Sequence, residues 1–252
     1  MKQQVRRCFD RAHATYSQAA VVQKEIAEAC ARLVPEEQTF ATALEIGAGG
    51  GLLTRSLLPR VQVGCYLACD LSRAMLAHLP AAHLHRFQAD GEQLPLPSGC
   101  VDLLVSASTL QWYTAPHRSL PANLDLLRPG GTFVLALFVR GTLPELAASS
   151  RATGFGTLQP LLPASTYRHI LDATPGLSWQ SRVQTHTQWH RSVTGFLRSH
   201  KKTGATFSPG RKAFLGKDRL ARFCRYYASR FARDNSIPAR YRVLYLWGRR
   251  GG

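Results

Sequence analysis

A glycine-rich turn between two regular segments constrains the fold of this chain more than any other feature. Residues 43–53 read ALEIGAGGGLL: an apolar run with one acid, Glu45, precedes glycines at 47, 49, 50 and 51 and the start of a helix. Glycine at 47 and 49 permits a sharp turn and leaves no Cβ between the backbone and a ligand. The stretch predicts the first strand–turn–helix unit of a nucleotide-type α/β domain; an ordinary tight turn is the alternative.

The spacing of these glycines distinguishes the turn from phosphate-binding loops. It differs from the dinucleotide fingerprint G-x-G-x-x-G, and the chain contains no G-x-x-x-x-G-K-[ST] P-loop. The observed order, E-x-G-x-G-x-G, resembles motif I of the class I S-adenosylmethionine (SAM) methyltransferases. SAM carries an amino acid and a sulfonium in place of a pyrophosphate, so such a loop has no phosphate to hold.

Two further acids follow predicted strands, at the edge where open parallel sheets bind ligands. The predicted strand 61–69 ends at Asp70, where nucleotide folds place a carboxylate against ribose hydroxyls. Asp90 and Gly91 follow the predicted strand 83–88. Asp90 could accept a hydrogen bond from an adenine amino group, and an ordinary turn aspartate is the alternative.

The alternation of apolar strands and helices predicts an α/β, Rossmann-like fold. We expect a seven-stranded, mostly parallel sheet with helices on both faces. Its strands are predicted at about 41–46, 61–69, 83–88, 101–106, 132–139, 177–190 and 240–247. Between them, a helix is expected over 51–58, and another over 117–127 that ends in a turn at 128–131.

We expect a single domain of four segments. They are a helical arm at 1–39, a ligand-binding core at 40–190, a basic helical insertion at 191–238, and the last strand and tail at 239–252. The insertion holds two helix-like stretches, 192–201 and 217–231, and separates strands that this fold usually joins by a tight hairpin.

Positive charge is concentrated in the last quarter of the chain. The formal net charge is +17, and residues 191–252 hold 16 Lys and Arg against two acids, whereas residues 1–190 hold 16 against 13. Such a field favours an acidic partner, which could be nucleic acid, a membrane surface or an acidic protein. A solvated basic surface is the alternative.

Other composition features point to a cytoplasmic protein with reduced thiols. The six cysteines form no C-x-x-C pair, so neither a disulfide framework nor a zinc site is expected. No apolar run approaches the roughly 20 residues of a membrane span. The first 16 residues lack the apolar core of a secretory signal.

Four segments outside motif I narrow the family. They are Phe9-x-Arg11-Ala12-x-x-x-Tyr16, Leu110-Gln111-Trp112, Gly141-Thr142-Leu143-Pro144-Glu145-Leu146 and Lys201-x-x-Gly204-Ala205-Thr206. Together they resemble the malonyl-[acyl-carrier-protein] O-methyltransferases of biotin synthesis over nearly the whole chain. Two features depart from the pattern: Glu45 and Ala48 stand where some relatives carry Asp and Cys, and residues 211–217 are unusually basic.

The resemblance implies methyl transfer from SAM to the free carboxyl of a malonyl thioester on acyl carrier protein, an acidic partner. The ester hides a charge, so that fatty-acid elongation can build a pimeloyl chain. A carboxylate is already ionised at neutral pH, so no general base and no metal are expected; positioning supplies the catalysis. The resemblance assigns the cofactor to Glu45, Gly47, Gly49, Gly51, Asp70, Leu71, Met75, Asp90, Gly91, Ser106 and Gln111.

Tyr16 and Lys201 belong to family segments and are assigned to substrate positioning, and Arg140, at the end of the predicted strand 132–139, is a further candidate. We expect Tyr16 to close over the cofactor and the reacting carboxyl, although an aromatic arm could instead pack on the sheet edge. Arg140 and Lys201 would orient an anion, or else be solvated surface charges. Beyond them, Lys202, Arg211, Lys212, Arg219, Arg222 and Arg225 would supply an outer field for the partner.

Two other functions remain as alternatives. The chain could be another SAM methyltransferase, acting on RNA or on a quinone-like molecule. Residues 106–109 read SAST where amine methyltransferases carry N-P-P-[FYW], and no RNA-binding module is visible, which disfavours nucleic acid. It could also be a non-catalytic nucleotide-fold binding protein, although the acids at 45, 70 and 90 disfavour that reading.

Overall fold

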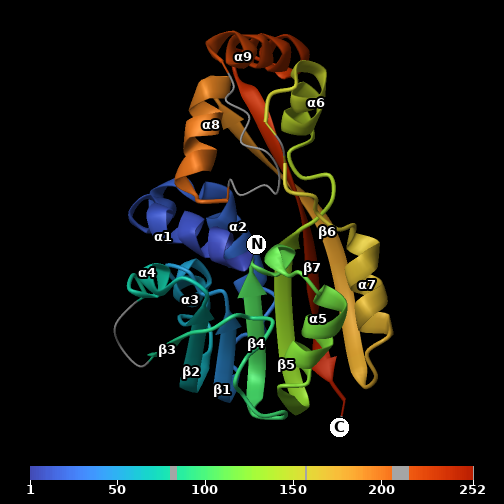
Figure 1. The fold of residues 1–252 in the computed structure, drawn as a ribbon. Coiled ribbons are helices and arrows are strands. Elements are labelled where there is room, and N and C mark those ends of the chain that lie inside the picture. Colours follow the sequence, from blue (N-terminus) through green and yellow to red (C-terminus); the bar gives the residue numbers. More distant parts are fainter. Residues whose placement is uncertain (80–83, 157, 206–215, 252) are drawn as a thin grey trace.

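A single twisted sheet organises the molecule (Figure 1). The computed structural model describes residues 1–79, 84–156, 158–205 and 216–251, and within them seven strands pair in the order β3-β2-β1-β4-β5-β7-β6. The strands are β1 (Thr39–Ile46), β2 (Gln62–Asp70), β3 (Leu84–Gln88), β4 (Val101–Ala107), β5 (Leu127–Phe138), β6 (Leu177–His190) and β7 (Ile237–Arg250). Neighbours among β1 to β5 are parallel, and β7 is antiparallel to both β5 and β6. The predicted seven-stranded, mostly parallel sheet is confirmed.

The strand order reverses between β1 and β4. From β1 the chain first builds outward through β2 and β3, and it then returns to place β4 on the other side of β1. Leu44 of β1 lies opposite Leu67 on one side and Leu104 on the other. A crevice forms at such a reversal, beyond the carboxyl ends of the strands, because the two connecting loops diverge there.

Alternate residues of the central strands pack into two separate cores. In β4, Leu103 and Val105 join the core beneath α2 (Val21–Ala31) and α3 (Leu52–Leu57), whereas Leu104 joins the core beneath α5 (Pro116–Leu124) and α7 (Ala164–Asp172). Both faces of the sheet are therefore covered. This burial explains why the central strands read as continuous apolar runs instead of alternating ones.

The arm consists of two helices. The sequence predicts a helical arm at 1–39, and the structure has α1 (Lys2–Ala19) and α2 there, which meet at the fully buried Ala20. Helix α2 packs on the sheet, whereas α1 crosses the carboxyl ends of the strands (Figure 1) and contacts both α4 (Arg73–Leu76) and α8 (Val193–Lys202). The turn at Ala20 thus places α1 over the crevice, so that this helix covers it.

The insertion rests on a two-stranded ribbon. Strands β6 and β7 pair along their whole length, from Leu177 opposite Arg250 to His190 opposite Ile237, but β5 pairs only with residues 243–249 of β7. The unpaired halves project past the sheet and carry α8 and α9 (Lys217–Phe231), with α6 (Pro144–Thr153) packed on α9 (Figure 1). We call this ribbon and its three helices the upper lobe.

Two predicted boundaries were wrong. Strand β7 spans Ile237–Arg250 instead of 240–247, because its ends pair with β6 in the ribbon. Helix α5 ends at Leu124. Residues 128–131, which were expected to form a turn, belong to strand β5, and the pairing of β4 with β5 is irregular at this point. The helix expected at about 51–58 is confirmed: it spans Leu52–Leu57, with Gly51 as its N-cap in a left-handed conformation and Leu58 as its C-cap.

The turn after β1 generates a stability prediction. Gly47 has φ of 74°, and a Cβ there would lie 2.1 Å from the Thr109 hydroxyl. Gly47→Ala should lower the free energy of unfolding by roughly 2–5 kcal/mol, combining a left-handed backbone penalty with overpacking. Gly176 has φ of 73° with no atom near its Cβ position, so Gly176→Ala should cost only about 1–2 kcal/mol. Equal losses in urea denaturation would contradict the close packing at Gly47.

Candidate functional site

A first pocket occupies the crevice beyond β1, β2 and β4, beneath α1. Its empty volume is about 890 Å³. Nine of the residues that the sequence nominates line it: Tyr16, Glu45, Gly47, Gly49, Asp70, Leu71, Met75, Asp90 and Gly91. The strand-end acids and the glycine-rich turn therefore meet in one place, which we call the acidic pocket.

Glu45 is the most buried acid of this pocket. Its Oε2 accepts hydrogen bonds from the Tyr66 hydroxyl at 2.5 Å and the Thr54 hydroxyl at 2.6 Å. Burial raises the pKa of Glu45 to about 7; these two hydrogen bonds oppose the rise, and the charge of Asp70 adds to it. A ligand with positive charge would favour the ionised carboxylate.

Asp70 joins the glycine turn to the segment after β2. Its Oδ2 accepts from the Gly49 backbone N–H at 2.9 Å, and its Oδ1 accepts from the Ser72 N–H at 2.7 Å. Burial raises the pKa of Asp70 to about 6, against the effect of these N–H groups. A Cβ on Gly49 would point at Met75 and Asp70, so glycine keeps this part of the pocket open.

Lys2 holds helix α1, which covers the crevice, at the end of β3 through two ion pairs. Its ammonium lies 2.6 Å from Asp90 Oδ1 and 2.6 Å from Glu92 Oε2. Burial opposes ionisation of Glu92, but hydrogen bonds from Lys2 and from the Thr114 and Ala115 N–H groups outweigh it and lower its pKa to about 2. A second contact holds the middle of α1, where Asp10 accepts from Ser72.

The donor set of the acidic pocket fits SAM. Three carboxylates, at positions 45, 70 and 90, face one cation, Lys2, among the described lining residues. Two of the three, Glu45 and Asp70, have raised pKa values because they are buried, and no described residue places a cation against either of them. A sulfonium and an ammonium would supply that charge, and a ribose would supply hydroxyl donors to a carboxylate.

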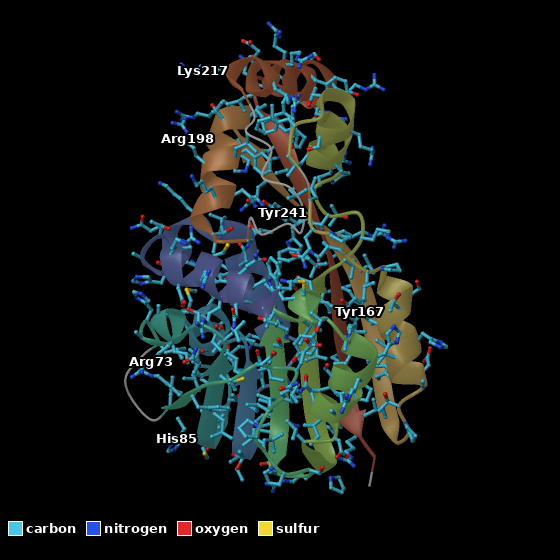
Figure 2. All side chains as sticks on the ribbon, in the orientation of Figure 1. Arg73, His85, Tyr167, Arg198, Lys217 and Tyr241 are labelled. Carbon is cyan, nitrogen blue, oxygen red and sulfur yellow. The ribbon has the colours of Figure 1, made fainter. Side chains whose placement is uncertain are left out.

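A second pocket lies between the sheet and the upper lobe, with an empty volume of about 1560 Å³. Its wall is mostly apolar, with Phe138, Leu143, Leu158, Leu161 and Leu197 among the lining residues. Arg140 and His200 are its basic side chains, and no acid lines it within the described residues. We call it the arginine pocket. Figure 2 labels Tyr241, another lining residue, at this level of the molecule.

Arg140 supplies the positive charge of the arginine pocket. It follows β5 and is exposed, and in the described part of the chain its guanidinium makes neither an ion pair nor a hydrogen bond. Burial, and then the neighbouring His190, lowers the pKa of His200 to about 4, so its imidazole is neutral at pH 7. The free charge of this pocket at neutral pH is therefore a cation that can bind an anion.

The two pockets share a wall. Phe9, Tyr16, Gln23, Ser108 and Trp112 line both. The ring of Phe9 meets Tyr16 and Trp112 edge to face, with centroids 6.3 and 5.8 Å apart. Burial, together with the charge of Asp70, raises the pKa of the Tyr16 hydroxyl. Aromatic rings from the arm and from the turn after β4 thus surround the point where ligands of the two pockets would meet.

Besides Arg140, four nominated residues do not line the acidic pocket. The fully buried Ser106 donates to the Ile46 carbonyl at 2.8 Å, so its hydroxyl ties β4 to β1, and the geometry gives no support for a cofactor contact. Gly51 caps α3, and Gln111 lines the arginine pocket. Lys201 is exposed and lines neither pocket, whereas its neighbour His200 lines the second.

The structure also adds residues that sequence reasoning missed. Lys2 carried no signal, because its partners lie 88 and 90 positions away. His200 could have been found from helical spacing, since it lies three residues after the pocket-lining Leu197. Ser108 lies between the nominated Ser106 and Gln111, and Trp112 belongs to the segment 110–112 that carries the resemblance, although neither was assigned a role. Arg211, Lys212 and Thr206, which the sequence nominated, lie outside the described residues.

Three other features bear on the sequence expectations. All six cysteines are free. Within the described ranges, no cluster of three or more His, Cys, Asp or Glu side chains could hold a metal ion. No helix in the part of the chain that the structure describes is both long and apolar enough to span a membrane.

The raised pKa of Glu45 predicts a pH effect on stability. Its pKa is 4.5 for an ordinary glutamate and about 7 in the fold, so between these values the folded state binds the proton more strongly. The free energy of unfolding of the ligand-free protein should therefore fall as pH rises from 4.5 to 7. Glu45→Gln should reduce this slope, and Asp70 should keep part of it because its pKa is raised in the same direction.

Glu92→Gln is the matched control for this measurement. The pKa of Glu92 is lowered, so its contribution to stability is lost only below pH 4.5, as pH falls toward 2. Urea denaturation at a series of pH values should show an unchanged slope between pH 5 and 7 in this variant. A Glu45→Gln protein with the wild-type slope would show that Glu45 is already ionised in the fold.

Comparison with known sequences agrees with this geometry. A family described as a methyltransferase domain matches residues 44–135. A malonyl-[acyl-carrier protein] O-methyltransferase of Geobacter sulfurreducens is 33% identical, over 99% of this chain and 99% of its own. Another, of Laribacter hongkongensis, is 32% identical over 97% of this chain and 88% of its own.

Solved structures share the fold at low sequence identity. The YcgJ protein of Bacillus subtilis aligns with a TM-score of 0.60 at 14% identity, over 93% of this chain and 98% of that one. A geranyl diphosphate methyltransferase in complex with SAM gives a TM-score of 0.51 at 15% identity, over 90% and 85%. With a full-length relative at 33% identity, this chain belongs to the malonyl-[acyl-carrier protein] O-methyltransferase family of the class I SAM-dependent methyltransferases.

Proposed function

We propose that this protein transfers a methyl group from SAM to the free carboxylate of a malonyl thioester carried by acyl carrier protein, early in pimeloyl and biotin synthesis. The observation that carries this proposal is the pair of joined pockets with opposite charge. The acidic pocket favours a cationic ligand, the arginine pocket favours an anionic one, and five residues line both. The names of the Geobacter and Laribacter relatives support the same reaction.

The residues of the acidic pocket would hold SAM by its charged and hydroxyl groups. Glu45 would face its amino-acid end, Asp70 its ribose, and Asp90 its adenine, with Leu71, Met75 and Gly91 shaping the cavity between them. When bound, SAM supplies a methyl group on a positively charged sulfur. The chain's own part is to fix the position of that methyl group at the wall shared with the arginine pocket.

The protein needs no general base for this reaction. A malonyl carboxylate is ionised at neutral pH, so its oxygen is already a nucleophile. Arg140 would bind and orient it, and Phe9, Tyr16 and Trp112 would keep water from the reacting atoms. The reacting anion and the sulfonium neutralise each other in the transition state, so a pocket with little water favours the transfer.

The upper lobe would recognise the carrier protein. Helix α9 buries Phe223 and Tyr227 and exposes Arg219, Arg222 and Arg225 on its outer side. Figure 2 shows Lys217 of the same helix and Arg198 of α8 on the outside of the lobe. Acyl carrier protein is acidic, so this field would steer it toward the arginine pocket, where its acyl group would enter.

The decisive experiment is methyl transfer from labelled SAM. Malonyl-carrier protein should become labelled, whereas the carrier protein alone, RNA and a quinone-like phenol should not. Asp70→Ala should weaken SAM binding by about 1.5–3 kcal/mol in calorimetric titration, the range for hydrogen bonds to a charged group. Asp102→Ala is the matched control, because Asp102 pairs with Arg128 away from both pockets.

Each alternative predicts its own result in that assay. Labelled RNA with unlabelled malonyl-carrier protein would identify a nucleic-acid methyltransferase, and a labelled phenol would identify a small-molecule enzyme. SAM binding with no labelled product would favour the non-catalytic protein. Any of the three would overturn the proposed reaction.

A series of charge variants tests which basic residues attract the carrier protein at long range. Reversal of Arg219, Arg222 and Arg225 to Glu should raise the KM for malonyl-carrier protein severalfold but hardly change that for malonyl-CoA. Exposed charges act mainly on encounter, and salt screens them over about 8–10 Å. The difference between the two substrates should shrink at high salt. Unaltered carrier-protein kinetics, with unaltered salt dependence, would exclude α9 as the docking surface.

Arg140 and Lys201 form a matched pair within this series. Arg140 lines the arginine pocket and Lys201 does not. Arg140→Gln should therefore reduce kcat/KM for both malonyl substrates, whereas Lys201→Gln should behave like the α9 variants and affect the carrier protein alone. The reverse pattern would make Lys201 the group that orients the carboxylate.

A further inference from the structure

The turn after β4 holds a strained residue and two unpartnered polar atoms. Ser108 has φ of 58°, in the left-handed region that side chains with a Cβ rarely adopt. The Ser108 hydroxyl and Gln111 Oε1 are buried and have no hydrogen-bond partner in the described part of the chain. Strain and unpartnered polar atoms both cost stability, and their coincidence at a pocket indicates a binding role.

The orientation of the Gln111 amide follows from the hydrogen bond that its side chain makes within the described residues. Its Nε2 donates to the Ser108 carbonyl at 2.6 Å, and a carbonyl can only accept. The amide oxygen must therefore be the atom left without a partner. The side chain is nine-tenths buried and lines the arginine pocket, and no described residue donates to this oxygen, so it is free to accept from a ligand bound there.

The two residues differ in the pockets that they line. Ser108 lines both pockets, so this residue belongs to the wall they share, where the methyl group would be transferred. Gln111 lines only the arginine pocket, away from the acidic one. The hydroxyl can donate to an anion at the transfer point, and the amide oxygen can accept from an N–H farther along the same ligand.

We propose that Ser108 donates to the carboxylate of the acyl substrate, and that Gln111 accepts from an amide N–H in the thioester arm. This inference rests on the proposed function and names the two groups of the substrate that the site recognises. A pantetheine thioester has an amide two carbons from its sulfur, so one substrate presents both groups. Conversion of the carboxylate to a methyl ester weakens the first hydrogen bond, because charged acceptors bind more strongly than neutral ones. The product therefore leaves more readily.

A pair of small substrates tests the assignment. Malonyl-N-acetylcysteamine contains the amide N–H, and the malonyl thioester of 4-oxopentanethiol replaces that N–H by CH₂. Wild-type protein should favour the amide substrate in kcat/KM by about tenfold, the equivalent of one hydrogen bond at 1.4 kcal/mol. Gln111→Met should bring the preference close to one. Gln159→Met, at another lining residue that donates to the Gln111 carbonyl, should keep it.

Ser108→Gly supplies an independent readout. Glycine adopts a positive φ freely, so the ligand-free protein should melt no lower than wild type. The variant should lose kcat/KM about equally for both thioesters, because both have the same carboxylate, and the preference for the amide should remain. This contrast distinguishes a hydrogen bond to the carboxylate of the substrate from a hydrogen bond to the amide N–H of its thioester portion.

The outcomes also separate this inference from the proposed function. Wild-type protein that methylates both thioesters without preference, or Gln111→Met protein that keeps the preference, would overturn the role of Gln111. Full activity in Ser108→Gly would overturn the role of Ser108. In each case the methylation of malonyl substrates by wild-type protein would stand.

Discussion

The buried carboxylate of Glu45 is the interaction on which the site depends. It accepts hydrogen bonds from Tyr66 of β2 and Thr54 of α3, so one side chain joins the first strand, its neighbour and the first helix. These bonds fix the glycine-rich turn that lies between β1 and α3. An acid without a buried cation would normally be costly, and its raised pKa records that cost. The fold keeps it at a place where a positively charged ligand would restore its ionisation.

A second constraint follows from the insertion. A tight hairpin between β6 and β7 would leave the crevice open on one side; instead both strands continue past the sheet and carry α8 and α9. The ribbon holds α8 against α1, and the space between the sheet and the upper lobe is the arginine pocket. The same segment thus builds the wall of the second pocket and carries most of the excess positive charge.

Local patterns were enough to predict the sheet and the acidic pocket. Strand-end acids and glycines are set by their position in a parallel sheet, so Asp70 and Gly49 could be placed without knowing the rest of the fold. Side-chain direction was harder to predict. Ser106 faces β1 because residues alternate along a strand, and the sequence does not show which face the pocket borders. Lys2 and Ser108 depend on the packing of α1 and on backbone strain, which no local pattern encodes.

The charges of the two pockets explain why they must be separate yet joined. Carboxylates near Arg140 would pair with it and leave no cation free for an acyl anion, and Arg140 beside Glu45 would remove the preference for a cationic cofactor. The chain places these groups on opposite sides of a wall that is aromatic at Phe9, Tyr16 and Trp112. A wall of low polarity screens charges little, so the carboxylates and Arg140 would interact strongly if they were close. Their distance from each other therefore preserves the preference of the acidic pocket for a cation and that of the arginine pocket for an anion. Attraction between the two bound ligands is then strongest across the wall itself, where the methyl group has to move.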